Sequence, residues 1–186
     1  MSALLRLEGV ACLRGGRLLF EDLDLTLERG AAAVVTGANG AGKSSLLRIA
    51  AGLLRPSAGN ASRAGAALAD ERAALDERRT LGDALAFWAA LDGVAAEPGM
   101  EAMGLTGLER VPVRILSTGQ RKRASLARAV SSEVPLWLLD EPANGLDEEG
   151  RSLLAAAMAA HRAGGGAVLA ATHQPIGLED ARLVAL

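Results

Sequence analysis

The residues whose types and spacing could do chemistry first gather between positions 37 and 45. In order they are Gly37, Ala38, Asn39, Gly40, Ala41, Gly42, Lys43, Ser44 and Ser45. The first eight fit the pattern G-x-x-x-x-G-K-[ST], in which glycines let backbone N–H groups turn inward around phosphate oxygens. In such a loop Lys43 reaches the β- and γ-phosphates, and the Ser44 hydroxyl is suited to ligate Mg²⁺. The stretch predicts a bound nucleotide, with all nine residues as candidate contacts.

The sequence around this loop supports the same interpretation. Residues 31–36 (AAAVVT) are apolar enough for a buried strand, and residues 44–54 have helical spacing. A strand, a loop and a helix in that order place phosphates at a helix N-terminus, where the helix dipole favours anions. The alternative is an accidental match in a chain that contains 22 glycines. The two motifs described next argue against that alternative.

A second group of candidate residues follows the apolar run 136–139 (LWLL), which ends in Asp140 and Glu141. An apolar strand ending in two acids, downstream of a phosphate-binding loop, is typical of a Walker B segment. There Asp140 would hold Mg²⁺, usually through water, and Glu141 would orient and polarise the attacking water. Taken alone, the run is equally compatible with an ordinary strand end and a solvated acidic turn. Together with the phosphate-binding loop it predicts nucleotide hydrolysis.

The third motif is Leu116-Ser117-Thr118-Gly119-Gln120, which is followed by three basic residues. It resembles the L-S-G-G-Q signature of the ATP-binding-cassette (ABC) ATPases, with Thr118 in place of the first glycine. A serine hydroxyl, a glycine N–H and a helix N-terminus meet there and form a second anion site. A serine-capped amphipathic helix is the plainer alternative. The resemblance implies an ATPase with ATP and Mg²⁺ as cofactors, in which Ser117, Gly119 and Gln120 contact nucleotide.

In the ABC family the signature of one subunit closes on the ATP of another, so the resemblance implies a homodimer that encloses two ATP molecules. Residues 144–147 (NGLD) resemble the family's D-loop, which lies across that interface. His173, after the apolar run 167–171, matches the family's switch histidine, which contacts the γ-phosphate. We therefore expect Glu141 and His173 to be the catalytic residues. His161 has no such placement, and we expect a helix-end histidine favoured by the helix dipole.

Two positions depart from the family's pattern. The glutamine that usually couples the Mg²⁺ site to the membrane subunit corresponds to Glu71, whose carboxylate could still bind Mg²⁺ or water. The aromatic residue that stacks on adenine corresponds to Arg14, whose guanidinium plane can also stack on a base. A solvated loop arginine is the alternative at that position. Phe87 and Trp88 lie in the region that touches the membrane subunit in ABC transporters, and they either mark a partner surface or pack into the core.

These motifs need a framework, which we predict from hydrophobic patterning. Strands are expected at 4–10, 23–28, 31–36, 66–69, 136–139 and 167–171, helices at 80–91, 119–132 and 147–162, and loops at 53–65 and 93–99. The alternation of strands and helices predicts an α/β fold with a mostly parallel core sheet. With the resemblance, this becomes a P-loop NTPase of the ABC type with antiparallel N-terminal strands. We expect one domain over residues 1–186, in which residues 70–132 form the Q-loop region and an inserted helical subdomain.

Composition limits the partners. The net charge of −2 offers no basic field for nucleic acid. Cys12 is the single cysteine, which excludes an internal disulfide and fits a reducing cytosol. The sequence has no run of about 18 apolar residues that could span a bilayer. Together with the resemblance, this implies a peripheral protein at the cytoplasmic face of the inner membrane, which contacts the membrane only through membrane-spanning partner subunits.

Within the ABC family the chain is most similar to the ATP-binding subunit of the haem exporter of cytochrome c maturation. Residues 135–142 (PLWLLDEP) and 172–175 (THQP) carry this similarity, as do the glycines after His161 and the departures at Glu71 and Arg14. The similarity implies that ATP binding and hydrolysis drive haem export for c-type cytochromes. The alternatives are another small ABC exporter, a soluble ABC ATPase that acts on nucleic acid or the ribosome, and a nucleotide-gated module without hydrolysis.

Overall fold

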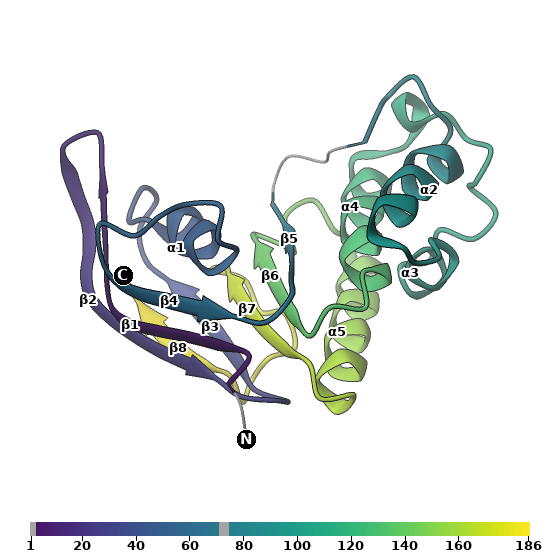
Figure 1. Cartoon of the computed structure of the whole chain (residues 1–186). Helices are drawn as coiled ribbons and strands as arrows, with labels where there is room; N and C mark the ends of the chain where they lie inside the picture. The colour runs from purple at the N-terminus through teal and green to yellow at the C-terminus, as the bar shows by residue number, and fades with distance from the viewer. Residues whose placement is uncertain (1–2, 71–74) are drawn as a thin grey trace.

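The computed structural model describes residues 3–70 and 75–186 (Figure 1). The strands are β1 (Leu5–Arg14), β2 (Arg17–Leu27), β3 (Ala32–Thr36), β4 (Ala58–Arg63), β5 (Ala66–Ala69), β6 (Leu136–Asp140), β7 (Ala167–Ala171) and β8 (Arg182–Ala185). The helices are α1 (Lys43–Ala50), α2 (Leu81–Asp92), α3 (Glu97–Ala102), α4 (Thr118–Ser131) and α5 (Glu148–Ala163), with a short 3₁₀ helix at Val113–Ile115. Glu71 lies outside the described residues.

The central sheet is parallel and has the strand order β5-β6-β7-β3-β8. Every residue of β6 and β7 is buried, as expected for strands covered on both faces. Successive side chains of a strand point to opposite faces. Trp137 and Leu139 therefore lie in one hydrophobic core, whereas Leu136 and Leu138 lie in the other. The short apolar run before Asp140 thus contributes side chains to both hydrophobic cores, one on each face of the sheet.

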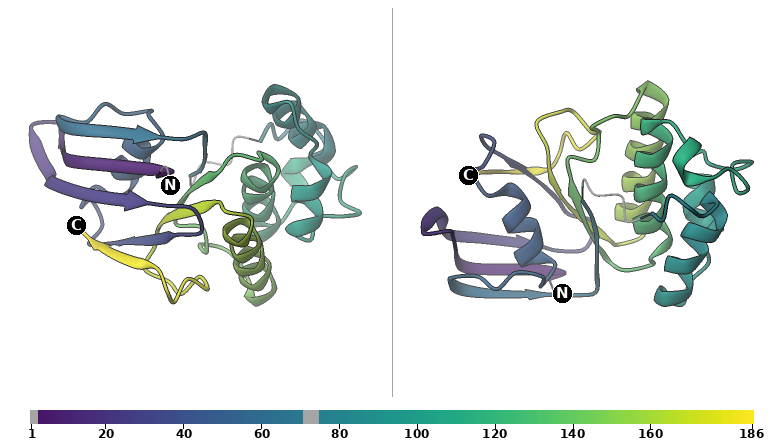
Figure 2. Two further views of the ribbon diagram at one scale, coloured as in Figure 1. Left: turned by 60° about the horizontal axis from the view of Figure 1, so that its bottom comes forward. Right: turned by 90° about the horizontal axis from the view of Figure 1, so that it is seen from above.

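The other elements form layers on the two faces of this sheet (Figure 2). Strands β2, β1 and β4 form a separate antiparallel sheet. Helix α1 packs between the two sheets and contacts β1, β4, β6 and β7. Helices α4 and α5 contact β5 and β7 on the opposite side, and α2 and α3 pack onto α4. The first residues of α1 therefore lie where both sheets can contribute side chains.

Local sequence explains where two helices begin. The Thr80 hydroxyl accepts the Asp83 N–H at 3.2 Å at the start of α2. At the start of α4 the Ser117 hydroxyl accepts the Gln120 N–H at 3.1 Å, and the Gln120 side-chain oxygen accepts the Ser117 N–H at 2.9 Å. This reciprocal capping box fixes the chain direction at the predicted signature motif.

The predicted α/β fold, with its parallel core sheet and antiparallel N-terminal strands, is confirmed. The helices expected at 80–91, 119–132 and 147–162 correspond to α2, α4 and α5. The predicted loops were partly wrong, because 53–65 contains β4 and 93–99 contains the start of α3. All residues of β4 are exposed, so only its pairing with β1 makes it a strand. Strand β8 was not expected and pairs with β3 at the sheet edge.

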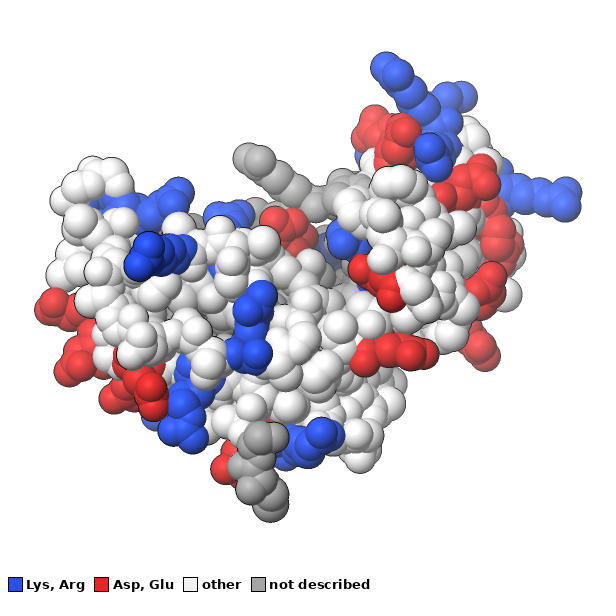
Figure 3. All heavy atoms as spheres, in the orientation of Figure 1, with Lys and Arg blue, Asp and Glu red and all other residues white. Residues whose placement is uncertain are grey.

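Charged side chains are distributed over the face shown in Figure 3. Basic and acidic side chains are interspersed on both the sheet region and the helical region. Among the described residues on this face, no continuous basic surface stands out, which agrees with the net charge of −2.

Candidate functional site

The predicted phosphate-binding loop connects β3 to α1. Gly42 caps α1 with a left-handed backbone (φ 113°), and a Cβ at this position would lie only 3.0 Å from the Phe20 ring. Glycine is required there both by the backbone angle and by the close approach of β2. The Lys43 ammonium donates to the carbonyls of Gly37 at 2.8 Å and Ala38 at 3.2 Å. The loop thus surrounds its lysine, with the N-terminus of α1 directed into the same space.

A cavity of about 490 Å³ opens over this loop. Its lining consists of Arg14, Leu19, Asn39, Gly40, Gly42, Lys43, Ser44, Ser45, Asp140 and Glu141. The loop, the end of β6 and the β1–β2 hairpin therefore meet at one place, although Arg14 and Glu141 are 127 positions apart in sequence. Arg14, which sequence analysis placed beside the base, comes from the end of β1 and is exposed. Leu19 was not predicted, and no motif marks it.

Glu141 follows β6 in a left-handed backbone conformation that non-glycine residues rarely adopt (φ 43°). Its N–H donates to the Ala171 carbonyl at 2.8 Å, which ties it to the end of β7. Its Oε1 lies 3.2 Å from the Nδ1 of His173. The side chain of Glu141 is 12% exposed, compared with 67% for His173. The strained backbone thus holds a shielded carboxylate beside an accessible imidazole.

The oxygens of this site suit a hard divalent cation. Asp140 is only 6% exposed at the end of β6 and lines the cavity together with the Ser44 hydroxyl. Glu141 Oε2 is buried and has no hydrogen-bond partner among the residues that the structure describes. Such an atom is normally satisfied by water or an ion. Within the described residues no group of three or more His, Cys, Asp or Glu side chains could hold a metal by itself. A Mg²⁺ ion here would therefore depend on phosphate oxygens and water as further ligands.

The signature residues lie apart from this cavity. Ser117, Gly119 and Gln120 sit at the start of α4, and none of them is among the residues that line it. The structure therefore brings Arg14, the phosphate-binding loop, Asp140 and Glu141 together within one chain, with His173 against Glu141. It does not bring the signature residues to the same place.

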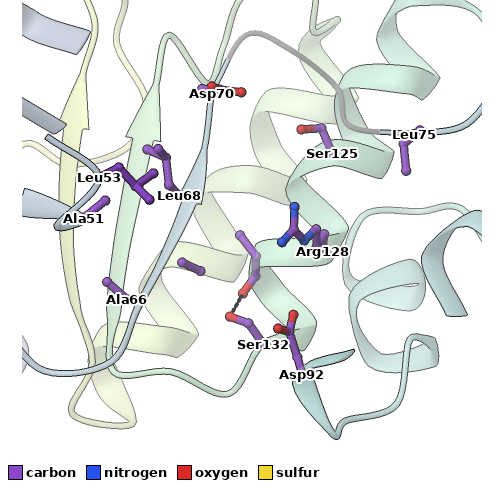
Figure 4. Close-up of a pocket in the computed structure, with 12 residues that line it drawn as sticks. Ala51, Leu53, Ala66, Leu68, Asp70, Leu75, Asp92, Ser125, Arg128 and Ser132 are labelled. Carbon is purple, nitrogen blue, oxygen red and sulfur yellow. Dashed lines mark hydrogen bonds between the residues drawn. The ribbon is translucent and has the colours of Figure 1, made fainter. Parts of the chain in front are cut away.

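A second cavity, of about 450 Å³, lies between β5 and α4 and contains none of the predicted nucleotide contacts (Figure 4). Arg128 of α4 lines it together with Asp92 and Asp70. The Arg128 guanidinium lies 3.6 Å from the centre of the Trp88 ring, and burial lowers the pKa of this arginine. Trp88 is thus held by packing within the helical region, whereas the neighbouring Phe87 is 47% exposed.

The prediction for His161 needs correction. The residue does lie in the last turn of α5, but its ring stacks on Trp137 with the centroids 4.0 Å apart. Burial lowers the pKa of His161, and its Nε2 is buried without a hydrogen-bond partner in the described part of the chain. Gly166 leaves the space that the ring fills, because a Cβ there would overlap the imidazole. His161 is therefore a neutral packing group, and desolvation outweighs the attraction of the helix dipole.

Comparison with known proteins agrees with this geometry. Residues 20–144 match the model of the family described as ABC transporter. A protein from Sphingopyxis alaskensis named cytochrome c biogenesis ATP-binding export protein CcmA is 55% identical over 97% of this chain and 95% of its own length. The chain belongs to the CcmA family of ABC transporter proteins. A CcmA from Zymomonas mobilis is 49% identical over 100% of this chain and 85% of its own length.

Solved structures show the same fold. The ATP-binding subunit of an ABC transporter superposes with a TM-score of 0.88 at 26% identity, over 98% of this chain and 85% of that one. An ABC transporter ATP-binding protein from Pyrococcus furiosus gives a TM-score of 0.84 at 20% identity, over 98% and 96% of the two chains, and supports the fold alone. None of the helices in the described part of the chain is long and apolar enough to cross a membrane.

Proposed function

We propose that this chain hydrolyses ATP to drive haem export in cytochrome c biogenesis. The main support for the proposal of hydrolysis is the position of Glu141. Its carboxylate is shielded and lines the cavity over the phosphate-binding loop. One oxygen contacts His173, and the other has no partner within residues 3–70 and 75–186. The transport step is supported by the relatives, whose names specify export in cytochrome c biogenesis. Haem as the cargo rests on the resemblance in sequence.

In the proposed mechanism the triphosphate lies along the loop from Gly37 to Gly42. Lys43 exchanges its bonds to two loop carbonyls for bonds to β- and γ-phosphate oxygens. Ser44 and Asp140 would hold Mg²⁺, which when bound neutralises phosphate charge. The free oxygen of Glu141 accepts a hydrogen bond from water and orients it toward the γ-phosphate.

His173 would contact the γ-phosphate, and its exposed ring beside Glu141 supports this role. In the same cavity the Arg14 guanidinium would stack on the base.

Two kinds of partner are part of this proposal. A second copy of the chain would supply Ser117, Gly119 and Gln120 to the ATP of the first, since these residues do not reach the cavity of their own chain. Membrane-spanning subunits would dock on the helical region, where Phe87 is exposed. The chain would then lie at the cytoplasmic face of the inner membrane without entering the bilayer.

The hydrolysis proposal is tested by Glu141→Gln, which keeps the shape of the side chain and removes its negative charge. We expect Mg·ATP to bind with unchanged affinity, dimers to accumulate in its presence, and turnover to fall by about 10²–10⁴-fold, the range typical of general bases. Glu149→Gln is the matched control, because Glu149 is exposed on the first turn of α5. Turnover near the wild-type rate in Glu141→Gln would remove this residue from its assigned role.

The transport proposal is tested by the partners of the chain. The tagged protein, expressed at its native level, would be purified from solubilised membranes and its companions identified by mass spectrometry. We expect membrane subunits of cytochrome c maturation. A different permease would keep the ATPase mechanism and overturn the cargo. Recovery without any membrane protein would refute the transport assignment.

A further inference from the structure

The turn that follows Glu141 is held by hydrogen bonds within the chain. The Asn144 N–H donates to the Glu141 carbonyl at 3.2 Å, and the Leu146 N–H donates to the Ala143 carbonyl at 3.1 Å. At the far end of the turn, Asp147 caps α5 by accepting the Gly150 N–H at 2.8 Å. The turn therefore connects the end of β6 rigidly to the start of α5.

Gln174 links this turn to the loop that carries His173. The Gln174 amide donates from Nε2 to Asn144 Oδ1 at 2.9 Å, and both side chains are half-buried. The backbone of Gln174 is also fixed. Its N–H donates to the hydroxyl of Thr172 at 3.0 Å, and Thr172 is buried, with 2% of its surface exposed. Two contacts thus join the same pair of loops: His173 to Glu141, and Gln174 to Asn144.

The same turn also touches the start of α4. A Cβ built on Gly145 would lie 3.5 Å from Thr118 Cγ2, which is ordinary van der Waals contact. A Cβ built on Gly119 would lie 3.2 Å from the Gly145 carbonyl oxygen. The backbone of Gly145 is therefore packed directly on the first turn of α4, and any shift of the turn must move against Thr118 and Gly119.

We propose that Gln174 is a positioning residue that couples the Glu141–His173 pair to the signature motif of the same chain. A change at His173 on nucleotide binding moves the Gln174 loop, and the bond to Asn144 transmits that movement to Gly145 and the start of α4. This inference rests on the proposed function, in which that signature serves the ATP of a second copy. Through Gln174, nucleotide binding at the ATP site of one chain would alter the signature motif that contacts the ATP of the second copy.

The test measures amide hydrogen exchange of the full-length chain with and without Mg·ATP. In the unmodified protein we expect Mg·ATP to slow exchange at residues 37–45 and to change it at residues 117–121. Gln174→Leu should leave the response at 37–45 intact and reduce the response at 117–121 by about two- to tenfold, the range that one neutral hydrogen bond supports. Arg151→Gln is the matched control. Arg151 lines the same groove as Gln174, and its guanidinium makes a bond of the same length, 2.9 Å, to Glu148 within its own helix α5.

Variants at Asn144 separate coupling from a merely structural effect. Asn144→Leu should reproduce Gln174→Leu, and the double variant should be no worse than either, because both remove one bond. Asn144→Asp still accepts from Gln174 and should keep the response. If the response at 117–121 is unchanged in Gln174→Leu, or if the two leucine variants add, the coupling is refuted while the proposed function stands. If Mg·ATP leaves exchange at 37–45 unchanged in the unmodified protein, both the proposed function and the coupling fail.

Discussion

Gly99 in α3 lies so close to α4 that a methyl group has no place there. A Cβ at Gly99 would overlap the carbonyl oxygen of Ala127 and the hydroxyl of Ser131. The Gly99 N–H donates to the Ser131 hydroxyl at 3.1 Å, and that hydroxyl donates to the Ala96 carbonyl at 3.2 Å. Ser131 is buried, so the two hydrogen bonds have no water to replace them. Gly99→Ala must therefore push α3 away from α4.

The cost of Gly99→Ala is the sum of three effects. Overpacking of a close helix contact costs about 1–3 kcal/mol. Loss of the two bonds at Ser131 costs about 1 kcal/mol each. Alanine gains back about 0.5–1 kcal/mol as the better helix former. The free energy of unfolding should fall by roughly 2–4 kcal/mol, which for a chain of this size lowers Tm by roughly 5–15 °C.

Thermal unfolding followed by circular dichroism measures this shift. Gly65→Ala is the control, because its Cβ would lie 3.6 Å from Val134 Cγ1 in ordinary contact, and we expect its Tm to stay near that of the wild type. The nucleotide cavity does not include Gly99, so binding of Mg·ATP below the lowered Tm should be retained. A Tm of Gly99→Ala within about 2 °C of the wild type would refute the close packing of α3 on α4.

Three further predictions address single residues. Burial lowers the pKa of His161, so the unfolded chain binds more protons below about pH 6.5, and stability falls as pH falls through that region. His161→Phe keeps the stack on Trp137 and should lose this pH dependence. The measurement is the urea midpoint of unfolding at several values between pH 8 and pH 5. An equal slope of midpoint against pH in the variant and the wild type would contradict the prediction. Gly42→Ala combines a left-handed backbone with a clash against Phe20, and should lower stability by about 2–4 kcal/mol and weaken Mg·ATP binding in titration calorimetry. Arg14→Ala should weaken Mg·ATP binding by about two- to fivefold and leave inorganic triphosphate binding unchanged, because an exposed cation–π contact is worth about 0.5–1 kcal/mol; an equal loss for both ligands would place Arg14 on the phosphates.

The local motifs could be predicted because their chemistry is contained in a few adjacent residues. The pattern from Gly37 to Ser44 already contains the glycines and the lysine that a phosphate-binding loop needs. The capping box at Ser117 and Gln120 is likewise a contact between residues three apart. The buried runs that became β6 and β7 were evident because central parallel strands are apolar on both faces.

Elements that depend on distant partners could not be predicted in the same way. Strand β4 (AGNASR) is polar and wholly exposed, and it forms because β1 offers an edge to pair with. Helix α3 contains Pro98 and Gly99 within six residues, so its sequence reads as a loop until α4 supports it. The neutral state of His161 also depends on its neighbour Trp137, which is 24 positions away in sequence.

The sequence by itself determined the family, the fold class and the residues suited to phosphate chemistry, since these follow from local patterns. Only the tertiary structure decided which of them meet. It brought Arg14 and the loop that holds Lys43 to the walls of one cavity, and it set the carboxylate of Glu141 beside His173. It also joined Gln174 to Asn144, two polar residues that no motif connects. Contacts of this kind form where strands of different sheets, and loops at one edge of a sheet, pack together. The partners are far apart in sequence, so no local pattern predicts that they meet.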